Sequence, residues 1–400
     1  MRFSERTGWN TEESELALAH RLRVEAGLPL ADLTASNPTR CGFRYDPDLL
    51  DALVDPQALD YDPQPRGSLR AREAVCAYYA SHGVKVEPSQ IVLTTSTSEA
   101  YSFLFRLLCD LESEVLIPQP GYPLFDFLAR LDDVRLKAAP LIYHEGWQLD
   151  MEGLRQAITA ETRAIVVVHP NNPTGHFTKP WEVEELGRIC RAFDLSLIVD
   201  EVFLDYPLKE TELAQAAVSF AAGIEGVPVF VVSGLSKIAG LPQMKAAWIV
   251  TTGPERGRAL DRLEVIADTF LSMNAPVQRA LPEWLEGREA IQSQIRERVA
   301  GNLAELDRQL ARAPVVGRLK AEAGWYAVLR IPALASDEQT VMELLERGVW
   351  VHPGYFFGMP DSGWLVVSLL AESPEFITGV TALVDYLETH QGSNLSRPAT

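Results

Sequence analysis

The chain has 400 residues, of which 47% are hydrophobic, and this is enough to bury a large core in two domains. Its formal net charge of −19 at pH 7 disfavours nucleic acid and anionic membrane surfaces as partners. No apolar run approaches the ~20 residues of a membrane span, and the sequence begins without the apolar segment of a signal peptide. The cysteines have no paired spacing, which predicts no metal site and reduced thiols in a cytoplasmic protein.

Short apolar strands alternate with helices along the first two thirds of the sequence. Capping and periodicity signals predict helices over residues 68–81, 98–110, 123–132 and 179–193. Apolar runs between them predict strands over residues 91–93, 164–168, 195–198 and 229–232. This alternation predicts an α/β fold with a mostly parallel sheet covered by helices on both faces.

A long charged helix is predicted next, over residues 288–312, with its charges on a solvated face. Strands and two further helices, near 337–346 and 374–389, then predict a smaller α/β unit. The sequence therefore predicts a large domain over 46–287. It also predicts a small domain formed by 1–45 with 288–390, and a disordered tail over 391–400.

Lys237 follows the apolar strand at 229–232 and a short run of small polar residues. A lysine in this position can lose solvation, which lowers its pKa and lets the neutral amine attack an aldehyde to form a Schiff base. Taken alone, the Ser-Lys segment is also typical of a solvated turn. The case for Lys237 as a nucleophile depends on what the neighbouring strands contribute.

Two other polar residues follow strands in the same part of the chain. Asn172 comes after the strand at 164–168, and Asp200 closes the strand at 195–198. In an open α/β sheet, ligands bind at the carboxyl ends of the strands. An aspartate beneath a pyridine nitrogen keeps that nitrogen protonated, so that the ring draws electrons from a substrate's Cα. The structural alternatives are a cap for Asp200 and an Asn-Pro-Thr-Gly turn for Asn172.

With these segments in this order, nearly the whole chain resembles the class I/II aminotransferases, pyridoxal-phosphate enzymes of fold type I. The resemblance implies a large cofactor-binding domain and a smaller C-terminal domain. It implies that Lys237 forms the aldimine with pyridoxal 5'-phosphate, that Asp200 pairs with the pyridine nitrogen and that Asn172 donates to the phenolic oxygen. No metal is implied.

The resemblance extends to the phosphate and the ring of the cofactor. Ser96, Thr97 and Ser98 match the family's phosphate cup, whose hydroxyls and helix-start amides would hold a dianion. The same serine can serve as an ordinary helix cap, and both interpretations can hold together. Tyr122, in the segment 118–123, matches the aromatic residue that stacks on the ring, although loop packing is the plain alternative.

Two segments match parts of the family that cross a dimer interface. Tyr61 matches the tyrosine that reaches the phosphate of the neighbouring subunit, and Asn274 lies in a segment that the family also sends across. The resemblance therefore implies a homodimer with active sites at its interface.

The chain departs from the family pattern near the phosphate and the phenolic oxygen. Lys245 stands eight residues after Lys237, where the family usually has an arginine that pairs with the phosphate, so charge is kept without the bidentate fork. Phe203 stands where the family usually has a tyrosine that donates to the phenolic oxygen. Tyr206 does not replace it if the strand continues, because a residue three positions on points to the opposite face.

The largest departure concerns the substrate. Val366, in the segment 363–370, stands where the family has an arginine that grips the α-carboxylate. Either another cation holds the carboxylate or the substrate lacks one. Arg40, with Asn37 in the same N-terminal loop, is the leading substrate-binding candidate, and a plain surface arginine is the alternative.

The sequence predicts an aminotransferase that moves an amino group between a small-molecule donor and a 2-oxo acid. In this interpretation Lys237 moves a proton from Cα to the cofactor's C4′. Another pyridoxal-phosphate reaction, such as elimination, decarboxylation or oxidation, is the alternative that Phe203 and Val366 keep open. A non-enzymatic cofactor-binding protein is disfavoured by the intact Lys237, Asn172 and Asp200.

Overall fold

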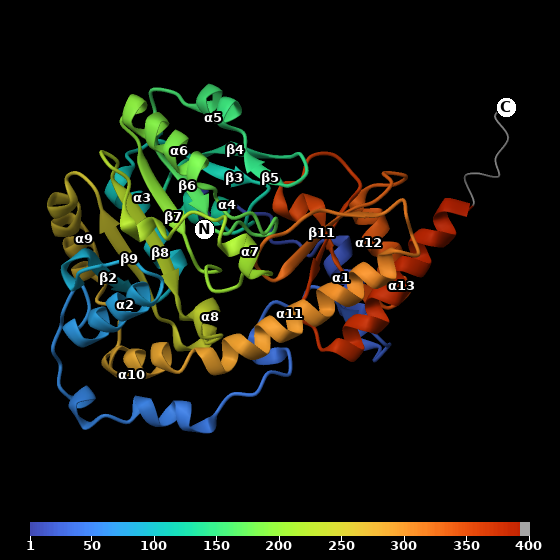
Figure 1. Cartoon of the computed structure of the whole chain (residues 1–400), viewed down its shortest axis with the longest axis horizontal. Coiled ribbons are helices and arrows are strands. Elements are labelled where there is room, and N and C mark those ends of the chain that lie inside the picture. The colour runs from blue at the N-terminus through green and yellow to red at the C-terminus, as the bar shows by residue number, and fades with distance from the viewer. Residues whose placement is uncertain (393–400) are drawn as a thin grey trace.

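The computed structural model describes residues 1–392 of the chain. Its centre is an eight-stranded sheet with the strand order β2-β9-β8-β7-β6-β3-β4-β5 (Figure 1). The strands are β2 (Ile91–Thr94), β3 (Glu114–Gln119), β4 (Arg135–Tyr143), β5 (Trp147–Leu149), β6 (Thr162–Val168), β7 (Ser196–Asp200), β8 (Val229–Gly234) and β9 (Ala247–Thr252). The five neighbours from β8 to β4 run parallel, and β9, β2 and β5 add antiparallel pairs. The predicted mostly parallel sheet is confirmed.

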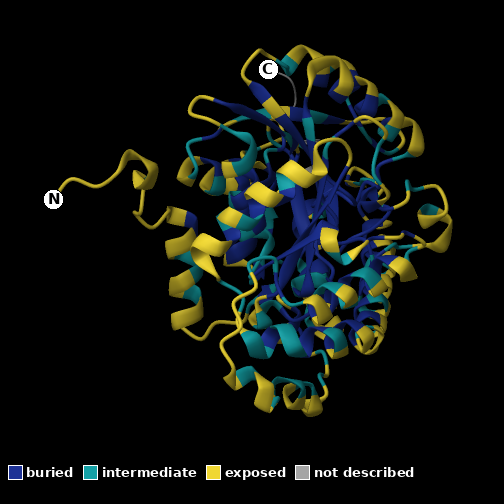
Figure 2. Ribbon diagram, turned by 90° about the vertical axis from the view of Figure 1, so that its left-hand side faces the viewer, coloured by how far each residue is buried: buried dark blue, intermediate teal, exposed yellow. Residues whose placement is uncertain are grey.

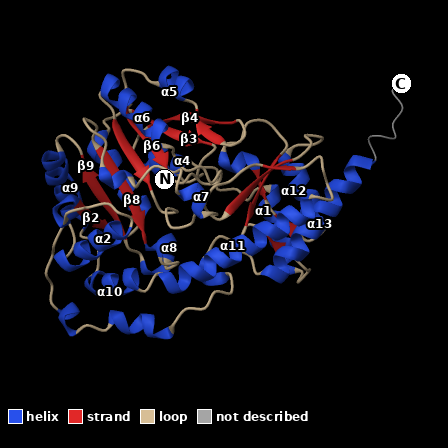
Figure 3. Ribbon diagram, in the orientation of Figure 1, coloured by secondary structure: helices blue, strands red, loops and turns tan. Residues whose placement is uncertain are grey.

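The central strands are apolar along their whole length because both faces of the sheet are covered. On β6, Ile165 and Val167 belong to one hydrophobic cluster, whereas Val166 and Val168 belong to another. The first cluster includes side chains of α2 (Leu69–Ser81), α5 (Met151–Ala157), α6 (Pro180–Phe193) and α10 (Ala275–Glu286). The second includes side chains of α3 (Thr97–Leu108), α4 (Phe125–Leu131) and α9 (Arg256–Phe270). Figure 3 shows the sheet enclosed by these helices, and Figure 2 shows that its strands are buried.

A smaller antiparallel sheet forms in the last third of the chain, with the order β10-β11-β14-β13. Its strands are β10 (Gly317–Arg318), β11 (Tyr326–Arg330), β13 (His352–Pro353) and β14 (Trp364–Ser368). The long helix α11 (Glu289–Leu310) runs from the large sheet to this unit (Figure 1). The other helices there are α12 (Asp337–Glu346) and α13 (Ser373–Gly392).

The N-terminal part of the chain joins the smaller unit. β1 (Ala31–Asp32) pairs in parallel with β12 (Val349–Trp350), after α1 (Glu15–Glu25). The predicted division into residues 46–287 and residues 1–45 with 288–390 stays a prediction. Of the predicted disordered tail, 391–400, the first two residues belong to α13, and the others lie outside the described residues. Among the described helices, none combines the length and apolar character needed to cross a membrane.

Candidate active site

Three adjacent parallel strands bring the predicted central residues to one edge of the large sheet. Val168 at the end of β6 is in register with Asp200 at the end of β7, and Asp200 with Val232 near the end of β8. Asn172 lies in the turn after β6, and Lys237 lies in α8 (Leu235–Ile238) directly after β8. The negative charge of Asp200 raises the pKa of the Lys237 amine, so the two groups lie close enough to interact electrostatically.

The Lys237 amine lies between two aromatic rings. Its Nζ is 4.9 Å from the ring centroid of Trp325 and 5.6 Å from that of Phe203. Burial lowers the pKa of Lys237 to about 8, although the charges of Asp200 and Cys41 act in the opposite direction. A substantial fraction of the amine is therefore neutral near neutral pH, as a nucleophile or general base requires.

The carboxylate of Asp200 is buried and held on both oxygens. The Tyr101 hydroxyl, from α3, donates to Oδ2 at 3.1 Å, and the Val202 backbone N–H donates to Oδ1 at 3.0 Å. Burial raises the pKa of Asp200 to about 6, against the lowering effect of these hydrogen bonds and of Lys237. A dry carboxylate of this kind is well suited to pair with a cationic ring nitrogen.

Three buried polar atoms around these residues have no hydrogen-bond partner in the described part of the chain. They are Asn172 Oδ1, Ser233 Oγ and Trp325 Nε1. Buried polar groups are nearly always paired in proteins, so these atoms are available to water or to a polar ligand. Within residues 1–392, no His, Cys, Asp and Glu side chains are grouped so that they could hold a metal ion.

The predicted phosphate cup forms the start of α3. Ser96 caps this helix by accepting a hydrogen bond from the Glu99 backbone N–H at 3.1 Å. Thr97 and Ser98 occupy the first turn, whose backbone N–H groups have no intrahelical partner. Lys245 is exposed just before β9, in the left-handed region at φ 53°.

The predicted ring-stacking and interface tyrosines are both exposed. Tyr122 is 46% exposed, and burial of its hydroxyl together with the charge of Asp200 raises its pKa, which places it near Asp200. Tyr61 is 84% exposed and lines a cavity of about 210 Å³ together with Asn274. The Asn274 side chain caps α10 by accepting from the Val277 N–H at 3.0 Å.

The predicted substrate-binding pair lies in an exposed 3-10 turn. Arg40 is exposed, and the side chain of Asn37 accepts hydrogen bonds from the N–H and the hydroxyl of Thr39. The structure therefore gives Asn37 a capping contact and leaves the guanidinium of Arg40 at the surface.

Phe203 and Tyr206 do not lie on a continuing strand, so the expected opposite orientation of Tyr206 is wrong. β7 ends at Asp200 and a turn follows. Both rings therefore pack edge-on against Trp325, at centroid distances of 5.1 and 5.0 Å.

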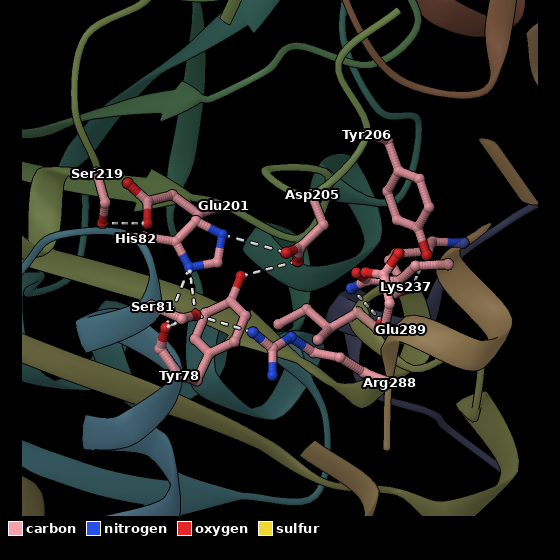
Figure 4. A network of polar contacts seen from close by, with 12 residues as sticks. Tyr78, Ser81, His82, Glu201, Asp205, Tyr206, Ser219, Lys237, Arg288 and Glu289 are labelled. Carbon is pink, nitrogen blue, oxygen red and sulfur yellow. Dashed lines mark hydrogen bonds and ion pairs between the residues drawn. The ribbon is translucent and has the colours of Figure 1, made fainter. Parts of the chain in front are cut away.

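The Tyr206 hydroxyl donates to the backbone carbonyl of Lys237 at 2.6 Å. Figure 4 shows Tyr206 beside Lys237, with Asp205 turned the other way toward Tyr78 and His82. Sequence reasoning missed Trp325 and Tyr101 as parts of the site, although Tyr101 lies three residues after the predicted phosphate cup.

Val366 is fully buried on β14, where it pairs with Val328 on β11 and with His352 on β13. The position at which the family arginine was expected is thus an apolar position within the smaller sheet. His352 is the nearest polar residue across the strand pair.

Comparison with known proteins identifies the family. The family model "Aminotransferase class I and II" matches residues 49–376. Alanine aminotransferase of Mycobacterium tuberculosis is 27% identical, covering 93% of this chain and 89% of its own length. Tyrosine aminotransferase of Dictyostelium discoideum is 23% identical, covering 87% of this chain and 85% of its own. Alanine aminotransferase from Pyrococcus furiosus shares the fold with a TM-score of 0.87 and 22% identity, over 97% of this chain and 100% of that one. The chain therefore belongs to the class I and II aminotransferases, enzymes of amino-group transfer.

Proposed function

We propose that this enzyme is a pyridoxal-phosphate-dependent aminotransferase that uses Lys237 to move an amino group between a small-molecule donor and a 2-oxo acid. The observation that supports the proposal is that Asn172, Asp200 and Lys237 lie at or just after the ends of three adjacent parallel strands. The pKa of about 8 for Lys237 gives its amine the proton affinity that this chemistry needs.

The residues present fit pyridoxal 5'-phosphate. Asp200 would hold the ring nitrogen, and the side-chain N–H of Asn172 would donate to the phenolic oxygen. Ser96, Thr97 and Ser98 at the start of α3 would bind the phosphate, because a helix N-terminus attracts anions. Lys245 would add a positive charge, and Tyr122 would cover the ring. When bound, the protonated ring withdraws electrons from the substrate's Cα and makes its proton acidic.

Lys237 then acts as the proton carrier. Its neutral amine removes the proton from the substrate's Cα as a general base, and its ammonium form returns the proton as a general acid. The hydrogen bond from Tyr206 to the Lys237 carbonyl fixes the backbone while the side chain moves. Phe203 and Trp325 exclude water from one side of the amine and keep its pKa low.

The proposal includes a homodimer in the cytoplasm, with no membrane or nucleic-acid partner. The net charge of −19 supports the exclusion of nucleic acid. Tyr61 is 84% exposed, which supports a role across an interface. Arg40 is the leading candidate to bind a charged group of the substrate.

Phe203 and Val366 favour one alternative, a different pyridoxal-phosphate reaction on the same fold, such as elimination, decarboxylation or oxidation.

A simple measurement separates amino transfer from this alternative. The purified enzyme is loaded with pyridoxal phosphate and incubated with amino donors, with and without an added 2-oxo acid. Sustained keto-product formation that requires the 2-oxo acid supports amino transfer, whereas keto product formed without it, or release of carbon dioxide, supports the alternative. Lys237→Ala should abolish either activity.

A further inference from the structure

A polar network adjoins the candidate active site and joins the C-terminal end of α2 to the turn after β7 (Figure 4). Its centre is Asp205 in that turn, whose side chain is only 7% exposed. The Tyr78 hydroxyl donates to Oδ2 of this carboxylate at 2.9 Å, and His82 Nε2 lies 3.1 Å from Oδ1. A buried carboxylate without such partners would be strongly destabilising. The network therefore fixes Asp205 to α2.

Both ring nitrogens of His82 face hydrogen-bond acceptors. Nε2 faces the Asp205 carboxylate, and Nδ1 lies 3.1 Å from the backbone carbonyl of Tyr78. A carboxylate and a carbonyl only accept, so both contacts are hydrogen bonds when each ring nitrogen of His82 carries a proton. Burial lowers the pKa of His82, but the hydrogen bond and the charge of Asp205 outweigh this effect and raise the pKa above the ordinary 6.5.

Two other charged groups lie around His82. The guanidinium of Arg288, at the start of α11, lies 5.3 Å from the centroid of the Tyr78 ring and donates to Ser81 Oγ at 2.8 Å. The charge of Arg288 acts to lower the pKa of His82. On the other side, burial raises the pKa of Glu201 to about 7, and the charge of His82 acts against this rise. The imidazole therefore lies between a cation at the start of α11 and carboxyl groups of the turn after β7.

The turn after β7 is fixed near both of its ends. The carboxyl group of Glu201, its first residue, accepts from the Ser219 hydroxyl and from the Phe220 backbone N–H, each at 2.7 Å. Asp205, four residues later, is fixed to α2 by the network described above. The residues between these two carboxyl groups are therefore held in one conformation.

This turn presents two rings to Lys237. The centroid of the Phe203 ring is 5.6 Å from the lysine Nζ, and the Tyr206 hydroxyl donates to the lysine carbonyl. The Tyr206 N–H also donates to the Phe203 carbonyl at 3.0 Å, which couples the two residues. Figure 4 shows the side chains of Asp205 and Tyr206 turned in opposite directions, one toward His82 and the other toward Lys237. A displacement of Asp205 therefore shifts the side chain that anchors the lysine.

We propose that Asp205 and His82 are positioning residues for Lys237. While His82 is protonated, Asp205 stays fixed to α2, and the turn holds Phe203 against the amine and Tyr206 against the backbone of the lysine. Loss of either group releases the turn and lets water reach the amine. The inference rests on the proposed function, because it assigns positioning residues to the lysine that the proposed reaction uses.

The first test measures Lys237 itself, in the cofactor-free enzyme. Asp205→Asn keeps the size of the side chain but removes its charge and one acceptor oxygen. Competitive labelling with a trace of acetic anhydride, followed by peptide mapping, gives the pKa of Lys237. That pKa should rise from about 8 toward the ordinary 10.5, by about 1 or more, because the amine regains solvation. Loss of a negative charge alone would lower the pKa, so the sign separates repositioning from direct electrostatics.

Glu114→Gln is the matched control. The buried carboxylate of Glu114 also accepts from one cation and one hydroxyl, those of Lys137 and Thr159. Glu114 is the first residue of the parallel strand β3, so it lies at the edge of the sheet opposite the candidate site. This variant loses the same kinds of contact as Asp205→Asn, yet it should leave the pKa of Lys237 and the turnover unchanged.

The second test uses the enzyme loaded with pyridoxal phosphate and an amino donor. Asp205→Asn should lower kcat by about 3- to 10-fold, the loss expected for one hydrogen bond, and should change KM by less than about 2-fold. His82→Gln supplies a donor that does not titrate. The contribution of His82 is fully present below pH 6.5 and is lost as the pH rises through its raised pKa in the folded chain. The ratio of the wild-type kcat to that of His82→Gln should therefore fall by about 3-fold from pH 6 to pH 9, and this ratio cancels the titration of Lys237.

Three results overturn the inference. If the pKa of Lys237 and kcat of Asp205→Asn both match wild type, Asp205 has only a structural role, even where the variant unfolds more easily. A fall in the pKa of Lys237 would mean that the charge of Asp205 acts directly on the amine. A kcat ratio that stays constant with pH removes the role given to His82.

Tyr78→Phe keeps the test decisive if Asp205→Asn does not fold. It removes one hydrogen bond to Asp205 and no charge, so it should raise the pKa of Lys237 by a smaller amount. An unchanged pKa in this variant would count against the inference. If the enzyme binds no pyridoxal phosphate, the proposed function fails, whereas labelling of the cofactor-free chain still decides whether Asp205 positions Lys237.

Discussion

The hydroxyl of Tyr206 donates a 2.6 Å hydrogen bond to the backbone carbonyl of Lys237, so a side chain from the turn after β7 fixes the residue proposed to do the chemistry. Two further donors hold the next turn of chain. Gln292 Nε2 donates to the carbonyl of Ile238 and the Tyr45 hydroxyl to that of Gly240, each at 2.7 Å. The short helix α8 is thus anchored from three separate parts of the sequence.

Tyr206→Phe should lower the free energy of unfolding by about 1–3 kcal/mol, because a buried carbonyl loses its partner while the ring still fills its place. Urea unfolding monitored by fluorescence measures the change. Tyr355→Phe, which removes an exposed hydroxyl, serves as the control and should change stability by less than about 0.5 kcal/mol. Equal stability of Tyr206→Phe and wild type would show that the hydrogen bond contributes little.

Borohydride treatment of the enzyme loaded with pyridoxal phosphate should attach a pyridoxyl group to Lys237. The amine of Lys237 has a lowered pKa and is close enough to Asp200 to feel its charge, whereas Lys245 is exposed. Peptide mapping by mass spectrometry locates the label. Lys237→Ala should remain unlabelled and should lose about 10²- to 10⁴-fold in turnover or more, the usual contribution of a general acid–base group. A label on Lys245 in the wild-type enzyme would overturn the assignment.

The stability of the cofactor-free enzyme should rise between about pH 8 and pH 10.5 through Lys237. Its pKa in the folded chain is about 8, against 10.5 for an ordinary lysine, so in this window the unfolded chain binds the extra proton. The destabilisation caused by burying the Lys237 amine is fully present below this window and is lost as the pH rises through it. From pH 7.5 to 9.5 we expect a gain of about 2 kcal/mol relative to Lys237→Met.

Urea unfolding of both proteins at the two pH values measures this difference, and the variant corrects for every other group that titrates there. A difference that stays constant with pH would mean that the amine is solvated in the folded enzyme. The aromatic contacts of Lys237 with Trp325 and Phe203 would then be insufficient to shift its pKa.

Mixing two inactive variants should restore activity if the enzyme is a homodimer with shared sites. Lys237→Ala lacks the nucleophile, and Tyr61→Ala lacks the exposed tyrosine proposed to reach the partner's phosphate. A hybrid dimer would contain one intact site, so up to about a quarter of the wild-type activity is expected from a statistical mixture. Refolding the variants together, with each refolded alone as a control, provides the comparison. Full activity of a monomer by sedimentation would refute the shared site.

Much of the site could be predicted because its central residues follow strand ends whose sequence pattern is clear. The apolar runs before Asn172, Asp200 and Lys237 identify neighbouring parallel strands, and parallel strands end at one edge of a sheet. In the structure these three strands are adjacent and end at one edge of the sheet, as expected. The helices α6, α11 and α12 also begin within two residues of their predicted starts, since Pro, Ser and acidic residues mark those ends.

What could not be predicted depends on contacts between distant parts of the chain. Tyr101 reaches Asp200 across 99 positions, and no local pattern distinguishes it from an ordinary core tyrosine. Trp325 reaches Lys237 only because the smaller unit packs against the large sheet. The orientation expected of Tyr206 was wrong because it assumed that the strand continues through Phe203, whereas β7 ends at Asp200 and a turn follows.

The pairing of the N-terminal strand with the C-terminal part of the chain has a consequence for synthesis in the cell. The backbone N–H of Asp32 donates to the carboxylate of Glu375, which lies 343 residues later, and β1 pairs with β12. At ~5–20 residues per second, the ribosome needs on the order of half a minute to produce the partners of a strand that emerged at the start. The large sheet can form during that interval, whereas the N-terminal segment has to wait. The smaller unit can therefore be completed only after the last helix has left the ribosome.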